Sequence, residues 1–270
     1  MDMQGAFNRH RPTADEMGLQ LVEEVAKNHL EYDEALCRRL IAEGASLDVT
    51  SKHGRKALIQ ASMCGRLGLV QQMVEKNANV NMQDSYGCTP LSMSMGSFEV
   101  TEYLLGKGAK LRENDVNKWS ELMSASDRFG GEKTAALLIA HGANVNFRDS
   151  EGMTPLLKSS FSGYPKTVRI LLENGANPNA QNEKGETPLM KSLSGGYHNI
   201  TAYLLHHGAD PLIQDKEGKN ALDHCFEYNA RQRELMEKTM NVRLKRMTGD
   251  GTRVPTAKLK KMVIKRKPGV

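Results

Sequence analysis

The sequence predicts an all-α solenoid, in which short helix pairs stack one on another along the chain. Two marks recur at one interval, and such self-similarity identifies a repeat architecture. The first mark is Gly-Ala, or Asn-Ala in one copy, and it begins at Gly44, Asn77, Gly108, Gly142, Gly175 and Gly208. The second is Thr-Pro-Leu or a degenerate form of it, with leucines at Leu58, Leu91, Leu122, Leu156, Leu189 and Leu222. Both marks advance by 33, 31, 34, 33 and 33 residues, so the length changes lie in loops between them.

The stretch 149–182 shows how one repeat begins. Thr154 is suited to cap a helix, because its hydroxyl can accept a hydrogen bond from an unsatisfied backbone N–H. Pro155 then takes the first helical position, where a missing N–H has no cost. Gly163 is expected to end this first helix.

A second helix completes the repeat. Pro165 stands near its start, and Val168, Leu171 and Leu172 lie at the i, i+3 and i+4 positions of one buried face. Gly175 is expected to end the helix in the left-handed conformation that glycine adopts at little cost. One such unit cannot bury its apolar face alone, so neighbouring units must stack.

This pattern resembles the ankyrin repeat, whose period is 33 residues and whose signature includes Thr-Pro-Leu and two antiparallel helices. The full Gly-x-Thr-Pro-Leu occurs in three copies, which begin at Gly87, Gly152 and Gly185. The resemblance covers roughly residues 15–247. It implies stacked helix pairs with β-hairpin fingers, and a concave face of finger tips and first helices that binds other macromolecules.

The expected domain organisation places helical caps at both ends of the repeats. Thr13 and Glu16 form a capping-box pattern that opens the first helix, whose outer face carries Glu23, Glu24 and Lys27. A longer last helix is expected over 230–247, with an apolar face that includes Leu235 and Met236. The predicted boundaries are a flexible N-terminus at 1–12, a repeat domain at 13–247 (N-terminal cap 13–50, about five repeats 51–214, C-terminal cap 215–247) and a basic tail at 248–270.

The unit that begins at Asp115 is irregular. Lys118 stands where the turn glycine is expected, Ser120-Glu121-Leu122 replaces Thr-Pro-Leu, and the loop 127–131 is enlarged. An irregular unit inside a solenoid is often a place of bending or binding, and the alternative is drift in a tolerant loop.

Charge is distributed unevenly along the chain. The net charge is +5, and residues 243–270 hold ten Lys or Arg against Asp250 alone, which is +9 and leaves −4 for residues 1–242. This asymmetry favours a polyanionic partner such as nucleic acid, an acidic protein surface or an anionic membrane, and the alternative is a solubilising tail. The candidate polyanion-binding residues are Arg243, Lys245, Arg246, Lys258, Lys260, Lys261, Lys265, Arg266 and Lys267.

No catalytic, cofactor-binding or metal site is expected. The segment 130–134 has glycines and a lysine but lacks the glycine that a phosphate loop needs directly before its lysine. His206 and His207 are adjacent, so they point to different faces of a helix and are poorly placed to bind one metal ion together. Histidines in the last turn of a helix more simply complement the helix dipole. His53, His141 and His224 show no paired carboxylate spacing.

Cysteine usage and hydropathy bear on the compartment. The four cysteines show no paired spacing, which indicates a reduced intracellular chain. No apolar run is long enough to span a bilayer. We expect a cytoplasmic protein, with a nuclear or assembly-bound location as the alternative, that is monomeric on its own.

The predicted function is a non-catalytic scaffold or adaptor that binds another protein on the concave face. Aromatic residues, Arg and Met are the residues that most often anchor interfaces. The candidate partner-binding residues are Tyr86, Trp119, Arg128, Arg148, Met153 and Phe161. Tyr86, Trp119 and Phe161 are expected to form one band, and the alternative is partial burial between fingers. The second function hypothesis is a subunit of a nucleoprotein or large assembly, anchored by the basic tail.

Overall fold

The computed structural model divides the chain into two compact units, Met1–Leu111 and Arg112–Val270, called unit 1 and unit 2 below. All the regular structure among the described residues is helical, which confirms the predicted all-α class. The residues that the structure describes are 11–28, 31–112, 120–225, 234–238 and 242.

The helices come in consecutive pairs, and each pair is one repeat. In unit 1 the helices are α1 (Ala14–Ala26), α2 (Glu34–Ala42), α3 (Ala57–Met63), α4 (Leu67–Glu75), α5 (Pro90–Met93) and α6 (Phe98–Gly106). In unit 2 they are α7 (Glu121–Ser126), α8 (Glu132–Ala140), α9 (Pro155–Ser162), α10 (Pro165–Glu173), α11 (Pro188–Ser194) and α12 (His198–His206).

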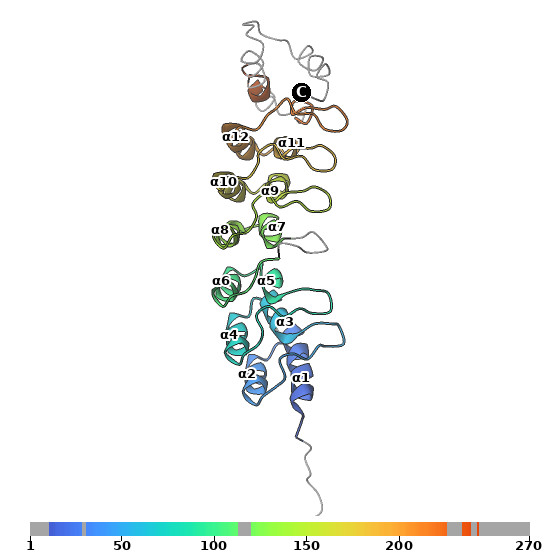
Figure 1. Ribbon diagram of the computed structural model, residues 1–270, viewed down its shortest axis with the longest axis vertical. Helices are drawn as coiled ribbons and strands as arrows, with labels where there is room; N and C mark the ends of the chain where they lie inside the picture. The colour runs from blue at the N-terminus through green and yellow to red at the C-terminus, as the bar shows by residue number, and fades with distance from the viewer. Residues whose placement is uncertain (1–10, 29–30, 113–119, 226–233, 239–241, 243–270) are drawn as a thin grey trace, which may run out of the picture. The chain divides into compact units, whose positions relative to one another are not determined.

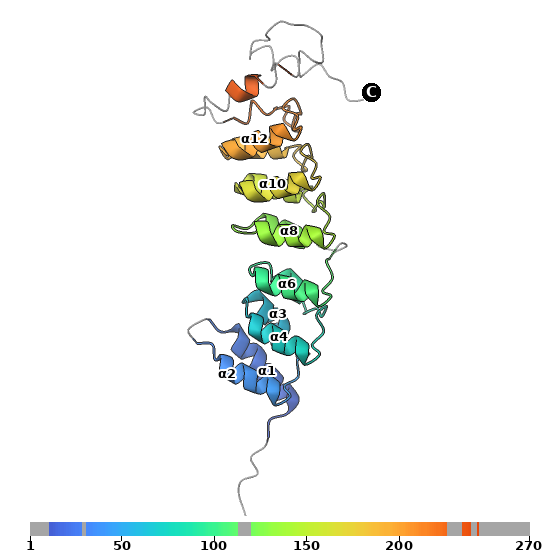
Figure 2. The ribbon, with the colours of Figure 1, turned by 90° about the vertical axis from the view of Figure 1, so that its left-hand side faces the viewer.

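Unit 2 consists of two helical layers. Helix α9 packs against α7 and α11, and α10 packs against α8 and α12. The loops that precede α9 and α11 project from the layer of α7, α9 and α11, on the side away from the other layer (Figure 1). Figure 2 shows α8, α10 and α12 lying parallel to one another. We call α7, α9 and α11 the inner helices and α8, α10 and α12 the outer helices.

The predicted caps and helix ends are present. The Thr154 hydroxyl accepts a hydrogen bond from the Leu157 N–H at 3.2 Å, and Pro155 is the first residue of α9. Thr13 and Glu16 form the complete capping box of α1. Gly163 and Gly175 adopt positive φ angles of 77° and 83°. Asn77, which replaces glycine in one copy, has a φ of 66°, and asparagine is among the few other residues that tolerate this region.

The predicted leucines form the core. Leu58, Leu91 and Leu189 have no exposed surface, and Leu171 and Leu172 are buried on α10. Met236, from the predicted last helix, is also buried, whereas Leu235 is exposed and most of 230–247 lies outside the described residues. Glu24 corrects the expectation of a charged outer face, because its side chain is buried against Lys27 and the Asp33 backbone N–H.

The fingers are closed by short turns that combine backbone and side-chain hydrogen bonds, and not by a regular β-hairpin ladder. Among the described residues only one isolated bridge occurs, between Thr50 and Lys56. In the finger before α9, the Asp149 carboxylate accepts hydrogen bonds from the N–H groups of Glu151 and Met153 at 2.9 and 2.8 Å. Asp and Asn side chains favour such turns because they satisfy the backbone two residues on. The Asp149 N–H also donates to the Met153 carbonyl at 3.0 Å, so a backbone hydrogen bond and the side-chain turn together close this finger.

Two asparagines of unit 2 each link a finger base to the next repeat. Asn146 Nδ2 donates to the Gly175 carbonyl at 3.1 Å, and its Oδ1 accepts from the Asn177 N–H at 2.8 Å. Asn179, 33 residues later, makes the same two bonds to Gly208 and Asp210. The link uses both ends of one amide, so it fixes the spacing of adjacent repeats.

The irregular repeat of unit 2 keeps its cap with different residues. Ser120 takes the place of threonine, and its hydroxyl accepts from the Met123 N–H at 3.2 Å. The neighbouring Glu121 is buried and its carboxylate contacts the Arg112 guanidinium at 3.1 Å. In the loop before α8, a Cβ on Gly131 would lie 2.0 Å from the Ala125 carbonyl oxygen, so only glycine fits there.

Candidate functional site

Two phenylalanines of unit 2 are exposed, and each is within two residues of a partner in one hydrogen bond between repeats. Phe161, in the last turn of α9, has 60% of its surface exposed, and Phe129, in the loop between α7 and α8, has 89% exposed. The Ser162 hydroxyl donates to the Asp127 carboxylate, which joins the end of α9 to that loop. Large aromatic side chains are normally at least partly buried, so the exposure of these two rings makes this part of the surface a candidate binding site.

A cation approaches Phe161 from the next repeat. The Lys191 ammonium of α11 lies 5.5 Å from the centre of the Phe161 ring. The same ammonium is 2.5 Å from the Glu186 carboxylate, which in turn accepts from Asn182 Nδ2 at 2.9 Å. The ring therefore lies next to a hydrogen-bonded polar network rather than in an apolar pocket.

The pairing of a finger carboxylate with a basic residue recurs along unit 2. Lys158 Nζ lies 3.9 Å from Asp149 Oδ2, and His224 Nε2 lies 2.8 Å from Asp215 Oδ2. Lys158, Lys191 and His224 are spaced by 33 residues. In the middle repeat the turn residue is the neutral Asn182, and Glu186 supplies the charge instead. We call these three pairs, together with Phe129, Phe161 and the Asp127–Ser162 bond, the inner face of unit 2.

Hydrogen bonds keep two of these carboxylates ionised. Burial raises the pKa of Glu186, but hydrogen bonds from Lys191 and Asn182 outweigh it, so the net pKa is lowered. Burial likewise raises the pKa of Asp215, and donation from the Lys219 N–H, His224 and the Glu217 N–H lowers it below its ordinary value. Both groups therefore carry a negative charge at neutral pH.

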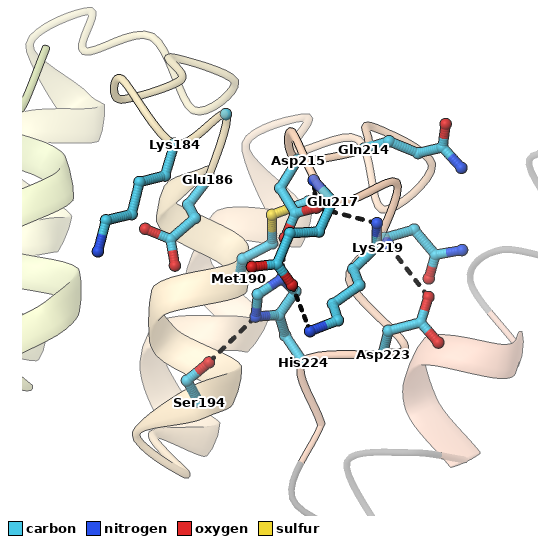
Figure 3. Close-up of polar contacts among 12 residues, drawn as sticks. Lys184, Glu186, Met190, Ser194, Gln214, Asp215, Glu217, Lys219, Asp223 and His224 are labelled. Carbon is cyan, nitrogen blue, oxygen red and sulfur yellow. Dashed lines mark hydrogen bonds and ion pairs between the residues drawn. The ribbon is translucent and has the colours of Figure 1, made fainter.

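His224 corrects the expectation that this histidine has no carboxylate partner. It bridges Asp215 to Ser194, whose hydroxyl oxygen is 3.4 Å from His224 Nδ1 (Figure 3). A serine nucleophile would also need backbone N–H donors for the oxyanion that forms on attack. The N–H groups of Gly195 and Gly196 instead donate to the Lys191 and Leu193 carbonyls at 3.1 Å. The geometry thus supports a structural role for His224, which links the finger at Asp215 to α11 at Ser194.

The structure places the predicted partner-binding residues differently from one another. Arg128 is exposed near Phe129, and Arg148 is exposed while its Nη2 donates to the Gln181 carbonyl of the next finger at 2.8 Å. Met153 corrects the expectation of an open contact residue. Only 8% of its surface is exposed, because it packs with Met123 and Leu157 in the core.

The predicted aromatic band stays a prediction. Tyr86 is 62% exposed and belongs to unit 1, where the Arg55 guanidinium lies 5.4 Å from its ring centre. Phe161 belongs to unit 2, and Trp119 lies outside the described residues. The nine candidate residues of the basic tail, from Arg243 to Lys267, also lie outside them.

Sequence reasoning missed Phe129 and the repeated polar pairs. The available signal for Phe129 was an aromatic residue at the centre of an enlarged loop. The signal for the pairs was the 33-residue spacing of Lys158, Lys191 and His224.

Other ligand chemistry finds little support in the described part of the chain. It contains no group of three or more His, Cys, Asp or Glu side chains placed to hold a metal ion. His207 Nδ1 lies 2.9 Å from the Tyr203 carbonyl oxygen at the end of α12, in keeping with a helix-terminal role. Within those same residues, no helix combines the length and the apolar character needed to cross a membrane.

Family comparison identifies the repeat. A family model described as ankyrin repeats (3 copies) matches residues 24–115 and 94–182, and one described as ankyrin repeats (many copies) matches residues 171–225. The chain belongs to the ankyrin-repeat family. This family is in general a protein-binding module without enzymatic activity, so the chain carries a protein-interaction scaffold.

Ankyrin relatives are similar over part of their length. Human SH3 and multiple ankyrin repeat domains protein 2 is 29% identical over 152 residues, which is 55% of this chain and 8% of that protein. Human ankyrin repeat and KH domain-containing protein 1 is 36% identical over 103 residues, which is 37% of this chain and 4% of that protein. The chain thus spans a small part of the length of these curated relatives.

Solved structures share the fold. The ankyrin repeat domain of human ASB11 superposes with a TM-score of 0.72 at 24% identity, covering 81% of this chain and 96% of that domain. An ankyrin repeat domain from Acinetobacter baumannii AYE gives a TM-score of 0.59 at 27% identity, covering 67% of this chain and 94% of that domain. At 24% identity, the likeness to the ASB11 domain concerns the fold alone.

Proposed function

We propose that the chain is a non-catalytic adaptor that binds a partner protein on the inner face of unit 2. The observation that carries the proposal is the exposure of Phe129 and Phe161, which lie within two residues of Asp127 and Ser162, the two partners of one hydrogen bond. Aromatic side chains that become buried on binding dominate the energy of many interfaces. Neither ring contributes much to the core, so their exposure favours binding over folding.

The surroundings of the two rings fit the rim of an interface. Lys191, Glu186 and Asp149 are paired within the chain, and Lys158 is the partner of Asp149. A partner that covers the rings therefore need not leave these charges unpaired. Such an apolar centre with a polar rim is the usual anatomy of a protein interface.

The test compares three variants of the full chain. Phe129→Ala and Phe161→Ala should each weaken partner binding by about 1–4 kcal/mol, the range for an aromatic anchor, with little change in thermal unfolding. Leu19→Ala is the matched control, because Leu19 is an exposed apolar residue of α1 in unit 1. Immobilised wild-type chain and each variant are incubated with a cell extract, and retained proteins are quantified by mass spectrometry.

The expected partner is a protein that both phenylalanine variants lose and the control retains. If both variants retain every protein that the wild type retains, the inner face is not the binding surface. A strong loss of thermal stability in either phenylalanine variant would instead assign that ring to folding.

The charge of residues 243–270 supports a second candidate, anchoring of the chain in a nucleoprotein or other polyanionic assembly. Ten cations against one acid should attract phosphates and release counterions, so binding should weaken steeply with salt. Fluorescence anisotropy of labelled duplex and single-stranded nucleic acid should show similar affinities for unrelated sequences, and removal of 248–270 should abolish most of the signal. Binding that is independent of salt would count against this role.

A further inference from the structure

A groove lies between the outer helices α10 and α12, and the inner face described above does not include it. Its volume is about 820 Å³. Lys166 and Arg169 line it from α10, and Asn199, Tyr203 and His206 line it from α12. These two helices belong to adjacent repeats and pack against each other, so one rigid part of unit 2 forms both walls.

The lining of the groove combines hydrogen-bond donors and cations with the apolar Pro165 and Ala202. Lys166 and Arg169 carry permanent positive charges, Asn199 offers an amide, Tyr203 a hydroxyl, and His206 a ring that donates at least one N–H. No carboxylate belongs to the lining among the described residues. This composition favours an anionic occupant.

The two cations remain accessible to a ligand. Lys166 Nζ lies 3.4 Å from Glu132 Oε1, and Arg169 Nε lies 4.0 Å from Glu173 Oε1. The Lys166 side chain is 74% exposed and that of Arg169 is 50% exposed. Ion pairs as exposed as these hold their partners weakly, so a ligand carboxylate can replace Glu132 or Glu173.

The preceding repeat shows that this lining is not a property of every repeat. At the positions 33 residues earlier, Ile170 replaces Tyr203 and Glu173 replaces His206. Ala136 replaces Arg169, while Lys166 and Arg169 themselves occupy the positions equivalent to Asn199 and Ala202. The equivalent site between α8 and α10 would therefore have three cations, but also a carboxylate on its wall and no tyrosine. A tyrosine and a wall without a carboxylate therefore distinguish the groove between α10 and α12 from the equivalent site of the preceding repeat.

We infer that the groove between α10 and α12 binds an acidic segment of a partner protein. The Arg169 guanidinium can accommodate one carboxylate with two parallel hydrogen bonds, and Lys166 can neutralise a second. The half-exposed Tyr203 ring offers apolar surface to the stem of an acidic side chain. A docked segment on this side would leave the inner face open to a different partner.

Charge decides between this occupant and two others. The chain's own residues 243–270 have a net charge of +9, so they are repelled by Lys166 and Arg169. Nucleic-acid binding usually draws on many phosphate contacts, whereas this groove offers two permanent cations. Two or three carboxylates of an extended peptide match that number.

The experiment measures the anisotropy of a fluorescein-labelled oligoglutamate peptide that contains a tyrosine, titrated with the full-length chain at low and physiological salt. Hydrogen exchange with and without peptide locates the binding site. Arg169→Ala should weaken binding by about tenfold or more, as expected for a lost charged hydrogen-bond pair. Alanine is the natural residue at the equivalent position 136, so this variant should fold, and thermal unfolding checks it.

Lys133→Ala is the matched control, because Lys133 occupies the position equivalent to Lys166 on α8 and does not line the groove. It should change the affinity less than about twofold, within the small effects expected of surface sites. The inference is overturned if Arg169→Ala and Lys166→Ala bind as well as wild type, if exchange protection appears only outside α10 and α12, or if a labelled duplex binds the groove more tightly than the peptide.

Discussion

At two places in the molecule, a side chain of one repeat covers the connection between the two helices of the repeat before it. We call this connection a joint. The two side chains that cover these joints occupy the same position in their repeats. Arg66 is the N-cap residue of α4, and Tyr197 is the N-cap residue of α12. In unit 1 the Arg66 guanidinium donates to the carbonyls of Val25 and Lys27, both at 2.8 Å. In unit 2 the Tyr197 ring covers Gly163, where an added Cβ would lie 2.5 Å from ring carbons.

The difference follows from the joint that each residue covers. The segment between α1 and α2 is long and leaves carbonyls at the end of α1, so a donor with several N–H groups satisfies them. The Arg66 guanidinium also lies 3.3 Å from the centre of the Tyr32 ring. The joint between α9 and α10 turns at a single glycine, which leaves a flat surface for an aromatic ring. One position of the repeat therefore closes the joint with hydrogen bonds in unit 1 and with packing in unit 2.

The largest expected effect comes from Gly163→Ala, which tests the packed joint. The methyl group would meet the Tyr197 ring, and the φ of 77° is unfavourable for any residue with a Cβ. The two effects should cost roughly 2–5 kcal/mol of unfolding free energy. Chemical denaturation followed by circular dichroism measures it.

Gly175→Ala is the control for this variant, because Gly175 has a similar φ of 83° with no atom within 4 Å of the added Cβ. It should cost only the backbone part, about 1–2 kcal/mol. Equal losses in the two variants would show that the Tyr197 ring does not restrict Gly163.

Arg66→Ala tests the hydrogen-bonded joint and should have an intermediate effect. It removes two charge-assisted bonds and the contact with Tyr32, and leaves the Val25 and Lys27 carbonyls without this donor. A loss of about 1.5–3 kcal/mol is expected. Arg66→Lys keeps the charge but not the planar fork, so it should recover less than half of the loss. Full recovery by lysine would mean that charge alone closes this joint.

Acid titration should give the smallest effect and should distinguish the two joints. The hydrogen bond from Lys27 lowers the pKa of Glu24, burial opposes this, and the Asp33 N–H lowers it further. Because the folded-state pKa is lowered, the stabilisation by Glu24 is complete above its ordinary pKa and is lost as the pH falls through the lowered value.

Hydrogen exchange of the α1 and α2 amides should therefore accelerate below about pH 4, after correction for the intrinsic exchange rate, and Glu24→Gln should remove part of this dependence. The joint between α9 and α10 is closed by packing of the Tyr197 ring against Gly163 rather than by a carboxylate. An identical pH dependence in Glu24→Gln and wild type would remove Glu24 from the comparison.

The sequence by itself determined the helix pairs, their order and their ends. The signals are local: Thr154 caps the helix by accepting from an N–H three residues away, Pro155 fits its first position, and Gly175 ends the next helix. Each depends on backbone geometry within one turn, so one repeat contains all the information. The burial of the repeated leucines could likewise be predicted, because the buried face of a helix follows the helical period of its apolar residues.

Only the tertiary structure decided which polar side chains are buried or paired. Glu24 was expected outside and is buried, Met153 was expected on the surface and lies in the core, and His224 has the partner Asp215. The physical reason is that stacking sets these environments. Ser194 and His224 are 30 residues apart, and Asp127 and Ser162 are 35 apart. Contacts at such separations exist only once one repeat lies against the next, whereas the signals that begin and end each helix lie within that repeat.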